Sequence, residues 1–271
     1  MTSLQSPTPS LTMARSLPQG ADELQQMGPF DLFRSQMEAG SAEAKVDAMK
    51  RLCVVAFAMG ADATLSTLIP YLSNVATKQP PHEDELLLLL ASESKGLVPN
   101  LLSNAVPLLP ILERLAAVEE TVVREEAVKA LNHVMDHIKE ANLLVAMAKR
   151  LVAADWFTPK VSAAGVMAKV YQISRDSELL GLYKELASDE TPMVRRGAAK
   201  HIGHFLEQVG FETAKDFLPV FQQLCRDEQD SVRLLASAAL ATIGESFGKH
   251  PEWTASNFLP ILKDGSTDMS W

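Results

Sequence analysis

The chain has 271 residues and a formal net charge of −9; its hydrophobic fraction is 47%, with aromatic residues at only 6%. Small and aliphatic residues suit closely packed helices better than a β-sandwich, which favours β-branched and aromatic residues. An acidic surface repels phosphate backbones and anionic lipid, so we expect neither nucleic acid nor a membrane as partner. Cys53 and Cys225 show no paired spacing, which argues against a disulfide framework or a CxxC metal site and fits a reducing compartment.

Residues 1–28 are rich in Ser, Thr, Pro and Gln. They lack the continuous apolar segment of about 7–15 residues that a signal peptide needs. The longest apolar run, residues 86–91, is far below the roughly 18 residues that span a bilayer. We therefore expect a disordered tail over residues 1–28, followed by a soluble repeat array. The expected location is cytoplasmic, with the nucleus as an additional compartment.

An apolar phrase with a central proline recurs along the chain. It reads LIPYL, LLPIL, FLPVF and FLPIL, with the prolines at Pro70, Pro110, Pro219 and Pro260. The first two prolines are 40 residues apart and the last two are 41 apart; the gap of 109 residues between the pairs holds about three repeats of similar length. A proline within a helix removes one N–H and crowds a carbonyl one turn back. We therefore expect each proline to kink the first helix of a repeat.

A second phrase, a short acidic turn leading into an apolar residue, follows each first one. It reads EETVVR at residues 119–124, DETPMVR at 189–195 and DEQDSVR at 227–233. With weaker copies included, the equivalent apolar positions are spaced by 40, 37, 38, 33 and 38 residues: Val46, Leu86, Val123, Val161, Val194 and Val232. Such even spacing is typical of a helical repeat protein.

The apolar positions after each turn follow steps of three and four residues, which is one face of a helix. We expect turn residues of the Asp, Glu, Thr and Ser types to cap this second helix by accepting from its free N–H groups. The predicted fold class is all-α, an α-α superhelix of about six and a half repeats. The predicted repeats are 29–61, 64–104, 105–139, 140–175, 176–211, 213–249 and a partial one at 253–271. Because a repeat stack needs a polar capping helix at each end, we expect this chain to be part of a longer array.

The repeat length and the Asp-to-Arg spacing of Asp189/Arg195 and Asp227/Arg233 resemble HEAT repeats. Four longer phrases resemble the family of structural A subunits, or scaffold subunits, of protein phosphatase 2A. They are LAAVEETVVREEAVKAL at 115–131, KRLVAADWFTPKVSA at 149–163, LASDETPMVRRGAAKHIGHF at 186–205 and CRDEQDSVRLLA at 225–236. The resemblance covers roughly residues 29–271. It is looser in the first two repeats, where the turn at residues 39–44 lacks the acidic pattern.

The resemblance implies a non-catalytic scaffold with no cofactor and no metal. In this family, intra-repeat turns of the N-terminal repeats bind regulatory B-type subunits, whereas later repeats bind the catalytic subunit. The chain matches only the N-terminal repeats, so we expect contact with the catalytic subunit only in a full-length scaffold. The resemblance assigns Arg195 and Arg233 to a structural ladder between turns. The residues it predicts to bind the regulatory subunit are Glu119, Glu120, Asp155, Trp156, Phe157, Asp189, Glu190, Thr191, Pro192, Met193, Asp227, Glu228 and Asp230.

Physical reasoning also favours the turns as a binding surface, because the helix faces of a solenoid are committed to neighbouring repeats. Trp156 and Phe157 stand in a turn where a small residue would suffice, and Trp is a frequent interface anchor. The alternative is that Trp156 packs inward across two helices. For Thr191 and Pro192 the alternative is plain turn chemistry, and for the acidic residues it is a solvated capping row.

Candidates for chemistry are weak. His133 and His137 lie four residues apart beside Asp136, and His201 and His204 lie three apart. Neither pair has the third ligand and general base of a zinc hydrolase motif such as HExxH. No Gly-rich phosphate loop and no GxSxG nucleophile elbow occurs in the sequence. The remaining alternative to a phosphatase scaffold is a generic HEAT-repeat adaptor or transport receptor with an unrelated partner.

Overall fold

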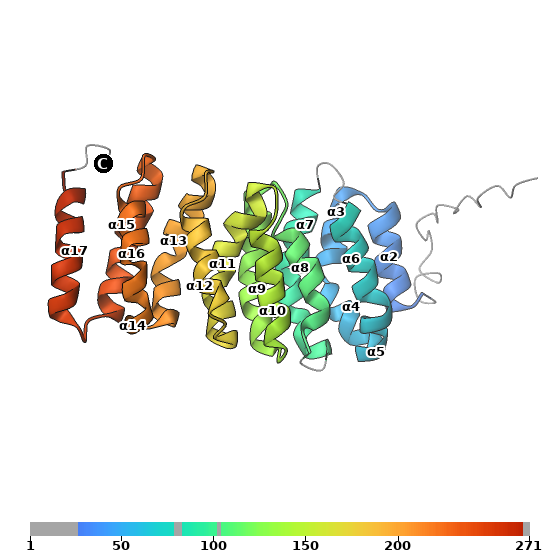
Figure 1. Cartoon of the computed structure of the whole chain (residues 1–271). Coiled ribbons are helices and arrows are strands. Elements are labelled where there is room, and N and C mark those ends of the chain that lie inside the picture. The colour runs from blue at the N-terminus through green and yellow to red at the C-terminus, as the bar shows by residue number, and fades with distance from the viewer. Residues whose placement is uncertain (1–26, 79–82, 102–103, 268–271) are drawn as a thin grey trace, which may run out of the picture.

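The structure is a computed structural model that describes residues 27–78, 83–101 and 104–267. Within those three ranges the chain is a single row of helices and loops without a strand (Figure 1). The helical fold class predicted from the sequence is confirmed. The predicted disordered tail, residues 1–28, lies outside the described residues except for Met27 and Gly28.

The helices in the N-terminal half are short and interrupted. They are α2 (Pro29–Ala39), α3 (Ala42–Lys50), α4 (Leu52–Met59), α5 (Ala61–Ala63), α6 (Ile69–Lys78) and α7 (Asp84–Ser94). Gly60, between α4 and α5, has a φ of 79°, a left-handed conformation that favours glycine. No single described helix is long and apolar enough to cross a membrane; the pair Leu52–Met59 and Ala61–Thr77 meets the length and composition test together but is bent by 119° at this break.

The helices from residue 109 onward pair regularly, and the second helix of each pair is the longer one. They are α8 (Leu109–Leu115), α9 (Thr121–Val134), α10 (Ala141–Val152), α11 (Phe157–Ser174), α12 (Glu178–Ala187), α13 (Pro192–Val209), α14 (Phe211–Ala214), α15 (Leu218–Cys225), α16 (Asp230–Ser246) and α17 (Pro251–Gly265). Each of the pairs α8–α9, α10–α11, α12–α13 and α15–α16 is one helix–turn–helix unit.

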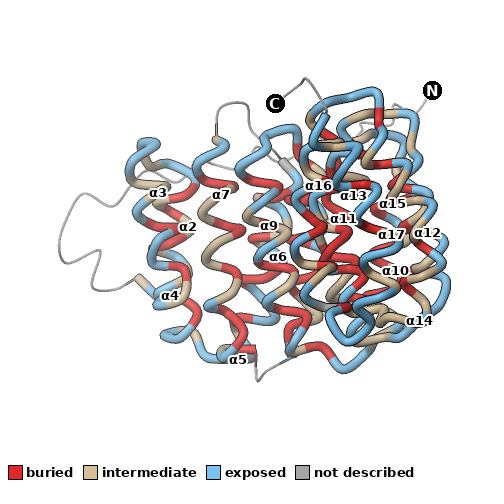
Figure 2. Tube along the Cα trace, turned by 90° about the vertical axis from the view of Figure 1, so that its left-hand side faces the viewer, coloured by how far each residue is buried: buried red, intermediate tan, exposed pale blue. Residues whose placement is uncertain are grey.

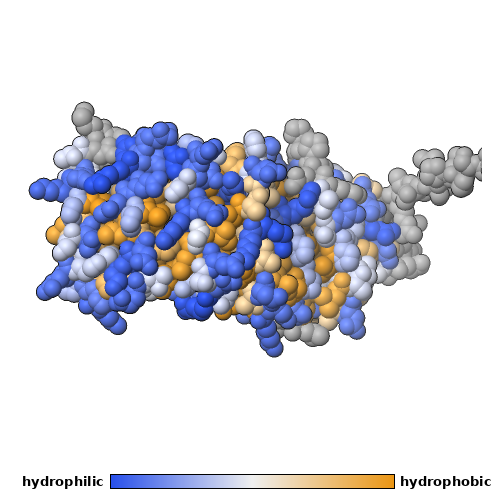
Figure 3. Space-filling view, in the orientation of Figure 1, coloured by the Kyte–Doolittle hydropathy of each residue, from blue (hydrophilic) through white to orange (hydrophobic). Residues whose placement is uncertain are grey.

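The units stack so that their helices form two layers. In one layer, contacts run from α3 to α7 to α9 to α11 to α13 to α16. In the other layer, α6 contacts α8, α10 contacts α12, α12 contacts α15, and α15 contacts α17. The apolar faces of both layers meet along the middle of the row, where the buried residues concentrate (Figure 2). On the face drawn in Figure 3, hydrophilic residues dominate the edges of the row and hydrophobic residues show between them. Of the six apolar positions that define the repeat, Val123, Val194 and Val232 are fully buried and Leu86 is 4% exposed. The other two, Val46 and Val161, are only partly buried.

Two of the recurring prolines differ from the expectation of mid-helix kinks. Pro110 and Pro219 lie in the first turn of α8 and α15. A proline costs little there because the N–H it lacks would have no partner within the helix. The 3₁₀ turns Val106–Leu108 and Lys215–Phe217 precede these two helices.

The other two prolines lie within continuous helical stretches. Pro70 is the second residue of α6, directly after the π-helical turn Thr64–Leu68. The regular hydrogen-bond pattern is therefore interrupted beside this proline, as is common for single π turns. Pro260 stands inside α17.

Candidate functional site

Four successive turns join the first helix of a unit to its second helix. They are residues 116–120, 153–156, 188–191 and 226–229, and we call them together the turn ridge. Hydrogen bonds and ion pairs connect neighbouring units along this ridge. The Thr158 hydroxyl donates to the Ala117 carbonyl over 2.8 Å, and the Ser162 hydroxyl donates to the Ala116 carbonyl over 2.6 Å. The start of α11 is therefore attached to the preceding turn.

An arginine early in the second helix closes three of the turns. Arg124 donates to the Val118 carbonyl over 2.9 Å, and Arg195 donates to the Asp189 carbonyl over the same distance. Arg233 repeats the arrangement with the Asp227 carbonyl at 2.9 Å. Each arginine follows its carbonyl by six residues. A guanidinium suits this role because its several N–H donors are arranged in a rigid fork.

Arg195 also reaches the next turn. Its Nε and Nη2 donate to the two carboxylate oxygens of Asp227 over 2.6 and 3.1 Å, and the Asp227 residue is only 9% exposed. Burial opposes ionisation of Asp227, but the hydrogen bonds from Arg195 and from the Gln229 N–H prevail and hold its pKa below the usual value. Asp227 therefore does not offer a free carboxylate to a partner, and we place it in the ladder with Arg195.

Asp189 occupies the equivalent position one unit earlier. Lys160 donates to it over 2.9 Å, and the Thr191 N–H donates over 2.8 Å. Burial would raise the pKa of Asp189, but these donors outweigh it, and the pKa lies below its usual value. Lys160–Asp189 and Arg195–Asp227 thus link three consecutive units through their turns.

The predicted capping pattern is wrong in its detail. The residues at the helix starts, Glu120, Trp156, Thr191 and Gln229, make no side-chain cap hydrogen bond. Asp189 and Asp227 instead accept from the N–H two residues further on, which stabilises the turn itself. A capping bond of the expected kind occurs at Ser41 before α3, in the repeat whose turn lacks the acidic pattern.

The turn ridge exposes large apolar side chains. Trp156 is 59% exposed and contacts the ring of Phe157, with ring centroids 5.2 Å apart. The alternative that Trp156 packs inward is therefore not observed. Phe157, in contrast, is partly buried against the core. Met193 at the start of α13 is also exposed.

Sequence reasoning missed two exposed apolar side chains near the ridge, Val122 in α9 and Leu234 in α16. The signal was present for Val122, which directly precedes the buried Val123 just as Met193 directly precedes Val194. The predicted acidic residues that remain exposed are Glu119, Glu120, Asp155, Glu190, Glu228 and Asp230, while Thr191 and Pro192 are half-buried.

The histidine pairs do not form a site with further ligands. The rings of His133 and His137 lie 5.8 Å apart. The described part of the chain contains no group of three or more His, Cys, Asp or Glu side chains that could hold a metal ion. His201 packs against α11, where its Nε2 would lie 3.4 Å from a Cβ placed on Gly165.

Comparison with known proteins finds similar helical-repeat proteins. The family model described as HEAT repeat matches residues 217–247, which contain the whole of α15 and α16. The regulatory A subunit of protein phosphatase PP2A from Saccharomyces cerevisiae is 36% identical over 83% of this chain and 38% of its own length. The protein of the same name from Schizosaccharomyces pombe is 33% identical over 93% of this chain and 44% of its own length.

A human relative, the beta isoform of the 65 kDa regulatory A subunit of serine/threonine-protein phosphatase 2A, is 35% identical over 69% of this chain and 32% of its length. Among solved structures, a designed armadillo repeat protein in complex with a peptide aligns over 80% of this chain with a TM-score of 0.45 and 18% identity. The chain spans less than half the length of these curated relatives. The chain is similar in sequence to the regulatory A subunits of protein phosphatase PP2A, and it matches the HEAT-repeat family model over residues 217–247.

Proposed function

We propose that this chain is a non-catalytic scaffold that holds a regulatory B-type subunit of protein phosphatase 2A on its turn ridge. The relatives are named as regulatory subunits rather than as phosphatases, which supports a role in assembly. A stack of helical repeats provides an extended surface of fixed geometry, and such a surface suits the positioning of one protein relative to another.

The observation that carries the proposal is the exposure of Trp156 directly before α11, whose start is hydrogen-bonded to the preceding turn of the ridge. Thr158 and Ser162 tie the start of α11 to the preceding turn. The Trp156 side chain therefore projects from a backbone that does not need to become ordered on binding, which keeps the entropic cost of association small. Large aromatic side chains in such positions often contribute most of the binding energy of an interface.

The other ridge residues complete the proposed contact surface. Met193, in the first turn of α13 directly after the ridge, adds a second apolar side chain, and the exposed carboxylates of Glu119, Glu120 and Glu190 lie on the turns before and after that of Trp156. An apolar centre with a charged rim is the usual anatomy of a protein–protein interface. The acidic rim favours a partner whose docking surface carries Lys and Arg.

The test is a pair of quantitative pull-downs of this chain, one with a purified regulatory B-type subunit, the other with the catalytic subunit. We expect Trp156→Ala to weaken binding of the B-type subunit by about 2 kcal/mol, or roughly 30-fold. Phe57→Ala is the matched control, because Phe57 is an exposed aromatic residue on α4, away from the turn ridge.

Binding of only the B-type subunit, lost with Trp156→Ala and kept with Phe57→Ala, supports the proposal. If the folded chain binds neither subunit, the alternative of a HEAT-repeat adaptor with an unrelated partner is favoured. Equal losses of binding for both variants would show that Trp156 is not part of the contact surface.

A further inference from the structure

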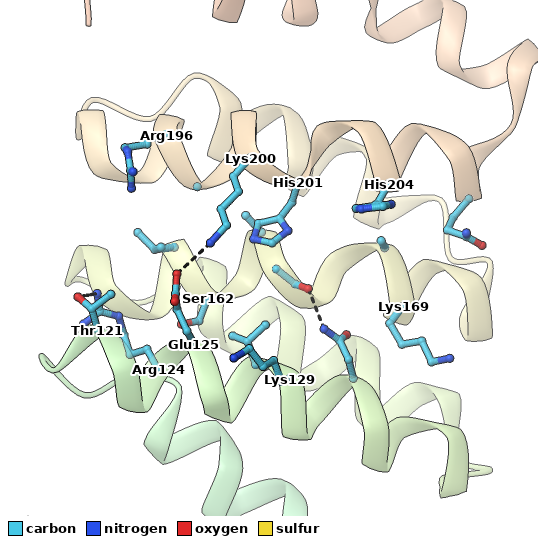
Figure 4. Close-up of a pocket in the computed structure, with 18 of the residues that line it drawn as sticks. Thr121, Arg124, Glu125, Lys129, Ser162, Lys169, Arg196, Lys200, His201 and His204 are labelled. Carbon is cyan, nitrogen blue, oxygen red and sulfur yellow. Dashed lines mark hydrogen bonds and ion pairs between the residues drawn. The ribbon is translucent and has the colours of Figure 1, made fainter. Parts of the chain in front are cut away.

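A groove of about 570 Å³ crosses the second helices of three consecutive units, α9, α11 and α13. Figure 4 shows its long polar side chains extending from α9 and α13 over the surface of α11. We call it the inner groove. It is separate from the turn ridge, and its lining comes nearest to the ridge at Thr121, Arg124 and Met193, at the starts of α9 and α13.

The floor of the inner groove is made of small residues. Gly165, Ala164 and Ala168 of α11 and Gly197 of α13 line it. A Cβ added at Gly165 would lie 2.8 Å from Cγ1 of Val128 on α9. The three helices therefore approach closely, and Lys169 and Gln172 are the two long side chains among the α11 residues that line the groove. The groove of about 570 Å³ lies above this closely packed floor, between the side chains of α9 and α13.

The walls carry an excess of positive charge. The lining includes five cationic side chains, Arg124, Lys129, Lys169, Arg196 and Lys200, but only two carboxylates, Glu125 and Glu207. This excess of three positive charges stands out in a chain whose formal net charge is −9. A concave surface of one sign attracts ligands of the opposite sign.

Several of these cations keep donors available. Arg196 is exposed and has no ion-pair or hydrogen-bond partner among the residues that the structure describes. Lys129 is exposed, and its ammonium group contacts Glu126 at the rim over 3.2 Å, which uses one of its three donors. Arg124 is committed to the carbonyls of its own turn, and Lys169 is paired with Asp136.

One ion pair bridges the groove. Nζ of Lys200 on α13 lies 2.9 Å from Oε1 of Glu125 on α9, although the two residues are 75 apart in sequence and belong to units that are not adjacent. Their side chains are 47% and 52% exposed. An exposed pair of this kind contributes little stability, so another carboxylate can replace Glu125 at Lys200 without a large penalty.

We propose that the inner groove binds an extended acidic peptide segment of a partner protein, one of whose carboxylates displaces Glu125 from Lys200. Further carboxylates of the segment pair with Arg196 and Lys129, while its backbone runs along the groove between α9 and α13. A nucleic acid fits less well, because a longer polyanion would run into the acidic residues Glu119, Glu120 and Glu190 of the turn ridge. This proposal does not rest on the binding of a regulatory subunit to the turn ridge.

The test measures binding of a fluorescein-labelled oligoglutamate peptide by fluorescence anisotropy. Two substitutions remove the same ion pair but predict opposite effects. Lys200→Gln removes a cation and should weaken binding about fivefold, whereas Glu125→Gln removes the competing carboxylate and should strengthen it about threefold. Lys50→Gln, at an exposed lysine of α3 far from the groove, should change nothing. Added salt should weaken binding because the contacts are between exposed charges.

Effects of the same sign for Lys200→Gln and Glu125→Gln would overturn the proposal, because they would show that the bridge acts on the shape of the array. Equal binding of an oligoglutamine peptide would also overturn it. Preferential binding of a labelled oligothymidylate would assign the groove to nucleic acid instead. Circular dichroism of each variant confirms that the helices are intact, so that each outcome reports on the groove.

Discussion

Two adjacent arginines show that residue type alone does not determine a role. Arg195 is buried, closes its own turn and pairs with Asp227 of the next unit, whereas Arg196 is exposed in the inner groove. A helix turns by about 100° per residue, so neighbouring positions face different surroundings. Arg195 stabilises the stack of units, and Arg196 is available to bind a ligand.

We therefore expect Arg195→Gln to lower the free energy of unfolding by about 3 kcal/mol, because it leaves the carboxylate of Asp227 buried without its cationic partner. Arg196→Gln on the same helix is the control and should change stability by less than about 0.5 kcal/mol. Urea unfolding followed by circular dichroism measures both. Similar values for the two variants would contradict the ladder assignment.

His201 is the residue whose titration should be visible in stability. Burial lowers the pKa of His201 to about 4, and the nearby positive charge of Lys200 acts in the same direction. An unfolded histidine has a pKa of about 6.5. The unfolded chain therefore takes up a proton at this site at a pH where the folded chain does not. Stability from this group is complete above about pH 6.5 and decreases as the pH falls from there towards about 4.

Between pH 7 and pH 5 this loss should be about 2 kcal/mol, and His201→Gln should abolish that part of the pH dependence. His204→Gln, at an exposed histidine of the same helix, should leave it unchanged. Thermal unfolding midpoints at the two pH values, compared among the three proteins, measure the effect. The same pH dependence in all three would show that His201 is not protected from protonation.

At the scale of elements, the second helices of the units stack closely because glycine and alanine occupy their contact faces. Gly165 faces α9 and α13, and Gly197 of α13 faces Val161 of α11, where a Cβ would lie 3.3 Å from Cγ1. Glycine lowers the intrinsic stability of a helix by about 1 kcal/mol relative to alanine. Packing between units compensates for that loss.

Two glycine substitutions should consequently differ in sign. Gly181 lies exposed in α12 with no atom within 4 Å of an added Cβ, so Gly181→Ala should raise the free energy of unfolding by about 0.5–1 kcal/mol. Gly165→Ala would bring its Cβ to 2.8 Å from Val128 and should lower stability by about 1–3 kcal/mol. Urea unfolding of both variants measures these changes. A higher free energy of unfolding for Gly165→Ala would mean that α9 and α11 can separate easily.

The whole molecule is a linear stack in which each unit contacts its neighbours, so local changes should stay local. Few contacts join distant units, and the bridge between Lys200 and Glu125 is one that passes over an intervening helix. The stability of such an array is approximately a sum of unit and interface contributions. Different parts of the chain should therefore open with different free energies.

Leu131→Ala tests this expectation. Leu131 is fully buried in α9, and its truncation should cost about 2–5 kcal/mol. Hydrogen exchange read by mass spectrometry should become faster in α7, α9 and α11 while α16 and α17 keep their rates. A uniform increase along the whole chain would instead show that the array unfolds as one cooperative unit.

The sequence by itself determined the helical fold class, the repeat spacing and the burial of Val123, Val194 and Val232, because all three follow from local periodicity. It also indicated the turns as the exposed surface, because the helix faces of a repeat stack are committed to neighbouring repeats. The recurrence of the prolines is visible in the sequence, but their position within a helix is not. Pro110 and Pro219 lie in the first turn of a helix because 3₁₀ turns precede them, and such turns have no clear sequence signal.

Only the tertiary structure decided which side chains of the turns are free. Asp227 and Glu228 are neighbours of the same acidic type, and both accept from Arg195 of the preceding unit. Asp227 is buried in that pair, whereas Glu228 stays largely exposed. The tertiary structure likewise decides that Trp156 is exposed while Phe157 is partly buried. It also forms the inner groove, whose ion pair joins residues 75 positions apart. These properties depend on the angle at which one unit packs against the next. Packing between residues distant in sequence sets this angle, and no local sequence pattern does.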